Sequence, residues 1–192
     1  MMDYWLEQLI NGLAGRDPTL DSAMVAIAAW SELAFIALVA GWLLAGILFR
    51  SRGERDQAFL ALLASGVALG ANQILGHVWD RPRPFAAHPG QVHLLLPHAA
   101  DSSFPSDHVA AAVAIAIVLA VAHRRLGGLM LLVSVLVGFA RVYVGDHYPG
   151  DVLAGTAVGI AAASFVLRTA RIRIVATAIL DRVLVLMRVQ PG

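Results

Sequence analysis

Five long apolar runs, separated by short segments that hold most of the charged residues, dominate the hydropathy pattern of the chain. A helix needs about 20 apolar residues to cross the hydrocarbon core of a bilayer. The pattern therefore predicts an all-α fold, a polytopic membrane bundle of about five transmembrane helices in a single domain, residues 1–192. The five runs cover residues 24–49, 58–79, 106–122, 126–143 and 152–167.

The two ends of the chain differ from these runs. Residues 1–20 carry Asp3 and Glu7 among apolar residues at helical spacing, which predicts an interfacial helix rather than a cleaved signal peptide. The tail, residues 171–192, is interrupted by Asp181 and Arg182. It is predicted to be an amphipathic interfacial helix or an irregular sixth span.

Composition narrows the chemistry. The chain is 59% hydrophobic, above the share of about half that is usual for a soluble domain. It has no cysteine, which excludes disulfides and thiolate sites. All of its 14 basic residues are arginine, which excludes lysine chemistry. A net charge of +1 argues against nucleic acid as a partner.

Arginine-rich turns indicate the orientation. They lie at residues 50–55, 124–125 and 168–173, which places all of them on one face, and the positive-inside rule makes that face cytoplasmic. The loop over residues 80–105 and the turn over residues 143–151 then lie on the extracytoplasmic face. Three polar segments meet at that face.

The first polar segment is Arg81-Pro82-Arg83-Pro84-Phe85. Its prolines favour an extended backbone, so Arg81 and Arg83 could face one anion. A helix stop with snorkelling arginines is the alternative.

The second segment is Phe104-Pro105-Ser106-Asp107-His108. Ser106 has the character of an N-cap, and a helix N-terminus can hold a phosphate within reach of His108. A plain capping sequence with a surface histidine is the alternative.

The third segment runs from Arg141 through His147 to Asp151. A spacing of four places His147 and Asp151 on one face of a helix. The carboxylate could then hold one ring nitrogen and leave the other free to attack. A helix-capping aspartate near a turn histidine is the alternative.

Together the three segments resemble the membrane branch of the type 2 phosphatidic-acid phosphatase superfamily, whose fold is shared with vanadium haloperoxidases. Its motifs are Lys, six residues, Arg-Pro; then Pro-Ser-Gly-His; then Ser-Arg, five residues, His, three residues, Asp. The matching residues here are Arg83-Pro84, Pro105-Ser106 with His108, and Arg141 with His147 and Asp151. The resemblance covers roughly residues 55–170, which would form the catalytic core.

Departures from the motifs point to a subgroup. The motif lysine falls at Gly76, and Asn72, His77 or Arg81 could replace it. The form Phe-Pro-Ser-Asp-His, with Asp107 in place of glycine, resembles the bacterial undecaprenyl-diphosphatases, which recycle the lipid carrier of cell-wall synthesis.

The resemblance implies a mechanism and a place in the cell. His147 would form a phosphohistidine, Asp151 would orient it, and His108 would protonate the leaving oxygen. The phosphate would be bound by Arg83, Arg141, Ser106 and Asp107, with Arg81 as a second choice. No metal or cofactor is implied.

The protein would be a multi-pass protein of the bacterial plasma membrane that acts on a lipid diphosphate in the bilayer, with its active site on the extracytoplasmic face. A phosphatase for glycerophospholipid monoesters, such as phosphatidate, is the alternative among enzymes. A lipid transporter or a non-catalytic scaffold is the alternative of a different class. The sequence indicates no oligomeric state.

Overall fold

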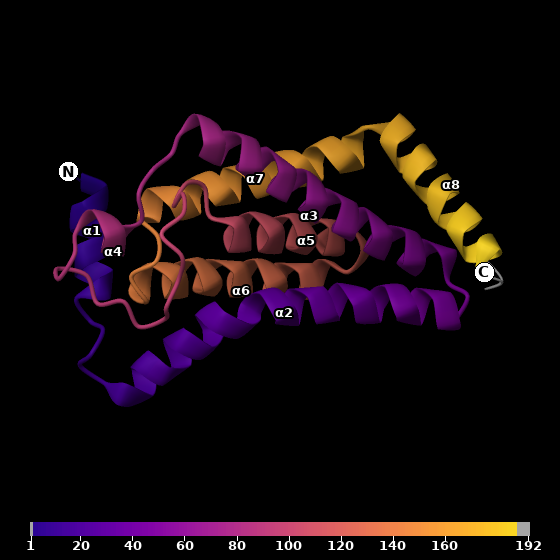
Figure 1. Cartoon of the computed structure of the whole chain (residues 1–192). Coiled ribbons are helices and arrows are strands. Elements are labelled where there is room, and N and C mark those ends of the chain that lie inside the picture. Colours follow the sequence, from indigo (N-terminus) through magenta and orange to yellow (C-terminus); the bar gives the residue numbers. More distant parts are fainter. Residues whose placement is uncertain (1, 188–192) are drawn as a thin grey trace.

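The computed structural model describes residues 2–187, which form a bundle of helices (Figure 1). These residues contain eight helices and no strand, which confirms the all-α prediction. The helices α2, α3, α6 and α7 surround α5, while α1 and α4 lie at one end of the bundle and α8 at the other. In chain order the helices are α1 (Met2–Asn11), α2 (Pro18–Leu48), α3 (Arg52–Val78), α4 (Pro84–Ala87), α5 (Asp107–Ala122), α6 (Arg124–Tyr143), α7 (Pro149–Arg168) and α8 (Ala170–Leu186).

Four of these helices, α2, α3, α6 and α7, are long and apolar enough to cross a membrane. The fifth predicted span corresponds to α5, which is apolar but has only 16 residues. It packs against all four of the longer helices, so most of its side chains are buried. The predicted group of five apolar helices is therefore four long spans around a shorter central helix.

The first span begins earlier than predicted. Asp17 caps α2 by accepting hydrogen bonds from the backbone N–H groups of Thr19 (2.8 Å) and Leu20 (3.2 Å). This cap starts the helix at Pro18 because proline fits the first helical turn, where its missing N–H is not needed. The interfacial segment predicted over residues 1–20 is therefore divided between α1 and the start of α2.

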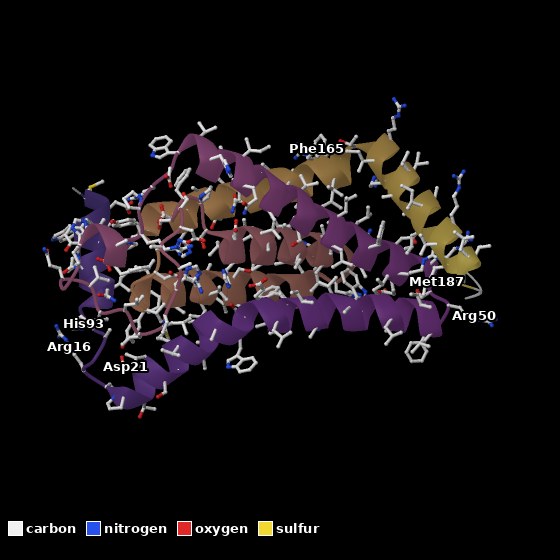
Figure 2. All side chains as sticks on the ribbon, viewed as in Figure 1. Arg16, Asp21, Arg50, His93, Phe165 and Met187 are labelled. Carbon is white, nitrogen blue, oxygen red and sulfur yellow. The ribbon has the colours of Figure 1, made fainter. Side chains whose placement is uncertain are left out.

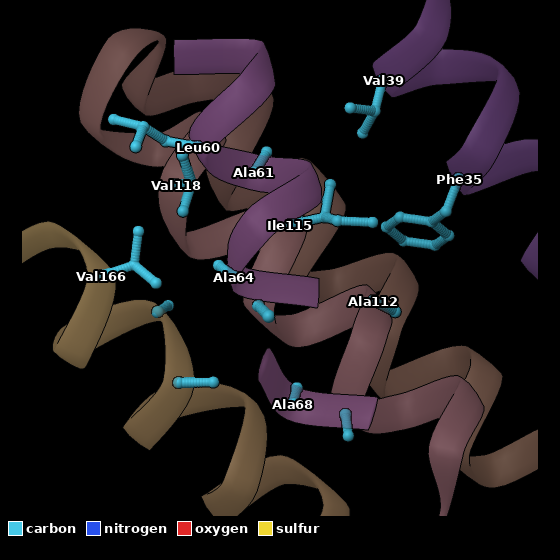
Figure 3. Packing of buried hydrophobic residues seen from close by; sticks show 14 of the residues in the cluster. Phe35, Val39, Leu60, Ala61, Ala64, Ala68, Ala112, Ile115, Val118 and Val166 are labelled. Atoms are coloured by element: carbon cyan, nitrogen blue, oxygen red, sulfur yellow. The ribbon is translucent and has the colours of Figure 1, made fainter. Parts of the chain in front are cut away.

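Small residues let the central helix approach its neighbours closely. Figure 3 shows Ala61, Ala64 and Ala68 of α3 in the same cluster as Ala112 and Ile115 of α5. On α7, a Cβ added at Gly155 would lie 2.5 Å from the Ser106 carbonyl oxygen, and one at Gly159 would lie 2.6 Å from that of Ala110. Both α7 glycines thus pack inside the bundle.

The two end helices are tied to the bundle by polar contacts. Asn11 of α1 donates to the backbone oxygens of His93 (2.9 Å) and Tyr143 (2.8 Å). At the opposite end, the buried Arg55 of α3 donates to Asp181 of α8 at 2.6 Å. The predicted tail is thus a helix as far as Leu186, and residues 188–192 lie outside the described part of the chain.

Candidate active site

A cavity of about 520 Å³ lies at the α1 and α4 end of the bundle. It is lined by the C-terminal ends of α3 and α6, the start of α5, the segment between α3 and α5, and the loop between α6 and α7. It brings residues of all three polar segments to one place. The predicted site residues that line it are Asn72, His77, Arg83, Asp107, His108, Arg141 and His147.

His147 lies in the short loop between α6 and α7 and is almost fully buried. Its Nδ1 is 2.9 Å from the backbone oxygen of Ser103. A carbonyl oxygen can only accept a hydrogen bond, so this contact assigns the proton to Nδ1 and leaves a lone pair on Nε2. Nε2 lies 3.3 Å from Nη1 of Arg83, which also lines the cavity.

Asp151 acts on this histidine differently from the prediction. Its Oδ2 is 3.8 Å from His147 Nδ1, too far for a direct hydrogen bond. The same oxygen accepts hydrogen bonds from Ser103 Oγ (2.5 Å) and from the Tyr148 N–H (2.9 Å). Asp151 therefore caps α7 and holds Ser103, whose carbonyl in turn orients His147.

The histidine is kept neutral by its surroundings. Burial lowers the pKa of His147, and the Arg141 and Arg83 guanidinium groups lower it further. The Asp151 and Asp146 carboxylates raise this pKa but do not offset the burial. A neutral imidazole with its lone pair on Nε2 is the form that can act as a nucleophile.

Two buried arginines stand beside His147. Arg83 donates to Asp146 at 2.8 Å and to Asp101 at 2.7 Å, and Arg141 forms an ion pair with Asp146. Burial would raise the pKa of Asp101, but the Arg83 guanidinium outweighs that effect and keeps this pKa below its ordinary value.

Asp146, which pairs with both arginines, is a site residue that the motifs did not indicate. The available signal in the sequence was its position directly before His147, while its place between Arg83 and Arg141 exists only in the folded structure.

Arg81, the second choice as a phosphate ligand, is not among the residues that line the cavity, and the structure pairs it with carboxylates instead. Its Nη2 lies 2.7 Å from Asp3 of α1, and its Nη1 lies 2.8 Å from Asp151. The guanidinium also stacks over the Tyr148 ring, 3.8 Å from its centroid. Arg81 and Arg83 therefore contact different carboxylates, since Arg83 pairs with Asp101 and Asp146.

The start of α5 also differs from the expectation. Ser106 is fully buried behind the cavity, and its side chain makes no capping bond. Its N–H donates to the Asp151 backbone oxygen (3.1 Å), which ties α5 to α7. Ser106 therefore packs between α5 and α7 and is not among the residues that line the cavity.

Asp107 is held by amide groups. Its two oxygens accept from Asn72 (2.8 Å) and Gln73 (3.4 Å) of α3. An ionised carboxylate repels phosphate, so its side chain is not suited to the expected binding role. Asn72 and His77 both line the cavity on the α3 side, where the motif lysine would lie. A Cβ at Gly76 itself would lie 3.2 Å from the Phe104 oxygen.

A neutral, buried histidine that faces two arginines inside a bundle of apolar helices defines a membrane-embedded phosphoryl-transfer enzyme. A family model described as the PAP2 superfamily matches residues 57–174. The chain belongs to the PAP2 superfamily, which confirms the predicted family and the phosphatase class of enzyme.

Three known proteins illustrate the relationship. Undecaprenyl-diphosphatase BcrC of Bacillus subtilis is 40% identical over 83% of this chain and 79% of its own length. The crystal structure of Aquifex aeolicus LpxE superposes with a TM-score of 0.73 at 28% identity, covering 88% of this chain and 96% of that one. A PAP2-type phosphatidylglycerolphosphate phosphatase from Bacillus subtilis gives a TM-score of 0.69 at 26% identity, over 86% and 82% of the two chains.

Proposed function

We propose that this protein hydrolyses the terminal phosphate of an undecaprenyl-type polyprenyl diphosphate in the bacterial plasma membrane, through a phosphohistidine on His147. The observation that carries the proposal is the hydrogen bond from His147 Nδ1 to the Ser103 oxygen. It directs the lone pair of Nε2 to the side of the buried arginines Arg83 and Arg141. The similarity to the Bacillus subtilis undecaprenyl-diphosphatase supports the choice of substrate.

In the first step, Nε2 of His147 attacks the terminal phosphorus in line, and the bond to the bridging oxygen breaks. The leaving lipid monophosphate takes a proton from His108, which lines the same cavity. Arg83 and Arg141 stabilise the equatorial oxygens, where the negative charge of the transition state lies. The positive charge that His147 gains is offset by Asp146 and, through Ser103, by Asp151.

In the second step, water attacks the phosphohistidine, and His108 accepts the proton of that water. The P–N bond breaks, and inorganic phosphate and neutral His147 are released. His108 thus donates a proton in the first step and accepts one in the second, while His147 keeps the proton on Nδ1 throughout.

The substrate assignment is tested by phosphate release from polyprenyl diphosphate, phosphatidate and phosphatidylglycerol phosphate, with His147→Ala as the control. We expect the highest kcat/KM with the diphosphate, and loss of release from every substrate in the variant. A higher kcat/KM with phosphatidylglycerol phosphate would favour the second candidate function, a glycerophospholipid phosphatase. The structural similarity to the phosphatidylglycerolphosphate phosphatase from Bacillus subtilis is the reason to include this substrate. Retention of a tenth of the activity by His147→Ala would show that another group attacks.

The extracytoplasmic location of the site is part of the proposal. The arginine-rich turns join α2 to α3, α5 to α6 and α7 to α8, all at the end of the bundle opposite the cavity. Figure 2 shows Arg50 at that end, and Asp21 and His93 at the other. Positive turns favour the cytoplasmic side, so the cavity would open outward.

Because the chain has no cysteine, single cysteines can test this orientation. Ala100→Cys, in the exposed loop before α5, should react with a membrane-impermeant maleimide in intact cells. Gly53→Cys, at the opposite end, should react only after lysis and is the matched control. The reverse pattern would overturn the orientation.

A further inference from the structure

Glu32 is a charged residue within a membrane helix that the mechanism above does not use. It lies near the middle of α2, and it is the only charged residue between Met24 and Phe49. A carboxylate in such a position is costly unless it has a polar partner, so an ionisable residue there indicates a functional role. Its partner identifies that role.

The partner is the proposed proton donor. Glu32 Oε2 lies 3.3 Å from Nε2 of His108 on α5, within ion-pair distance. The two side chains meet in a second cavity of about 290 Å³ between α2, α3 and α5. It adjoins the phosphate-facing cavity, and Gln73, Asp107 and His108 line both. Glu32 lines the second of these two cavities and not the first, so it does not line the cavity that holds Arg83, Arg141 and His147.

The charges around His108 explain why a carboxylate is needed there. Arg141 lines the same cavity as His108, and its positive charge opposes a positive charge on the His108 ring. Asp146 lies near but already pairs with Arg83 and Arg141. Glu32 lies within ion-pair distance of His108, and among the described residues it forms no ion pair with an arginine. Its charge also acts on Arg141.

We infer that Glu32 is a positioning residue for His108: its carboxylate holds Nε2–H and offsets the charge of the imidazolium that protonates the leaving oxygen. Nδ1 of His108 then carries the transferable proton, and it takes the proton of the attacking water in the second step. This inference rests on the proposed function of His108 as general acid, but not on which lipid is the substrate. Glu32 itself contacts neither phosphate nor the reacting atoms.

The test compares two aryl phosphates of nearly equal shape. Phenyl phosphate has a basic leaving group that needs a proton, whereas 4-nitrophenyl phosphate has a good leaving group that does not. The measured quantity is kcat/KM, which covers formation of the phosphohistidine and not its hydrolysis. General acid catalysis contributes about 10²–10⁴-fold, so misplacing the acid should cost a part of that.

We expect Glu32→Gln to lower kcat/KM for phenyl phosphate by about tenfold or more, and to leave that for 4-nitrophenyl phosphate nearly unchanged. Glu32→Asp, which keeps the carboxylate on a shorter side chain, should recover part of the loss. Ser31→Ala is the matched control because Ser31 lines the same cavity and its hydroxyl makes no hydrogen bond in the described structure. It should behave as the parent with both substrates.

An equal loss with both aryl phosphates would show that Glu32 supports only the fold, and no loss with either would show that His108 does not need it. Both results would overturn the inference. The outcome is independent of the substrate assignment: failure to hydrolyse polyprenyl diphosphate would reject the proposed substrate, while the aryl phosphate comparison would still decide the role of Glu32.

Discussion

Replacing Gly155 by alanine tests the packing that brings the two catalytic histidines together. Gly155 lies on α7, one turn after Asp151, and faces the segment that starts α5. The added Cβ would lie 2.5 Å from the Ser106 backbone oxygen and 3.4 Å from its carbonyl carbon. The obstructing atoms belong to the backbone, so no side-chain rotation can relieve the contact.

The magnitude follows from these distances. Favourable contacts between heavy atoms need about 3.5 Å, so α7 and the start of α5 must separate by about 1 Å. Overpacking of this kind costs about 1–3 kcal/mol, which for a protein of this size lowers Tm by about 2–4 °C per kcal/mol. A displacement of about 1 Å at the reacting groups can cost about 10²-fold in rate, because His108 follows Ser106 on α5 while His147 precedes α7.

The assay is phosphate release together with thermal unfolding in detergent, with Gly70→Ala as the control. Gly70 is exposed on α3, and a Cβ there would meet nothing within 4 Å. Alanine is the better helix former by about 1 kcal/mol, so the control should keep its activity and should keep or raise its Tm by about 2–4 °C. Parental activity and Tm in Gly155→Ala would refute the reasoning, as would equal losses in both variants.

Three further results follow from the geometry of the site. Arg81→Ala should lower kcat and Tm but leave KM near the parental value, because Arg81 contacts Asp151 and not the cavity; a raised KM would mean that it binds phosphate. Ser103→Ala removes the hydrogen bond to Asp151 but keeps the carbonyl that orients His147, so kcat should fall by about tenfold, as expected for a hydrogen bond to a charged group worth about 1.5–3 kcal/mol; an unchanged kcat would show that this bond is dispensable. Since burial lowers the pKa of His147 and the attacking form is neutral, the acid limb of kcat/KM should lie below the ordinary histidine value of about 6.5; an acid limb above that value would contradict the neutral assignment.

The sequence by itself determined the elements and most of the chemistry. Long apolar runs predict helices because lipid offers no hydrogen-bond partner to the backbone. A helix satisfies all of its backbone hydrogen bonds within its own segment. The arginines and histidines at the ends of these runs predicted the end of the bundle that holds the site. Arg83, Arg141, His108 and His147 all line one cavity, as expected from their motifs.

The tertiary structure decided how those residues are paired. Arg81 and Arg83 are two positions apart in the chain, yet one contacts Asp3 and Asp151 and the other contacts Asp101 and Asp146. Which carboxylate an arginine meets depends on which helices are neighbours, and spacing along one segment does not contain that information.

The same reason explains the residues that the sequence did not reveal. Ser103 joins Asp151 to His147, and Glu32 meets His108, across separations of more than 40 residues along the chain. Ser106 has the sequence signature of an anion-binding cap but is buried against α7, because Gly155 leaves room for its backbone. Contacts of this kind exist only once the helices have packed, so only the folded bundle determines them.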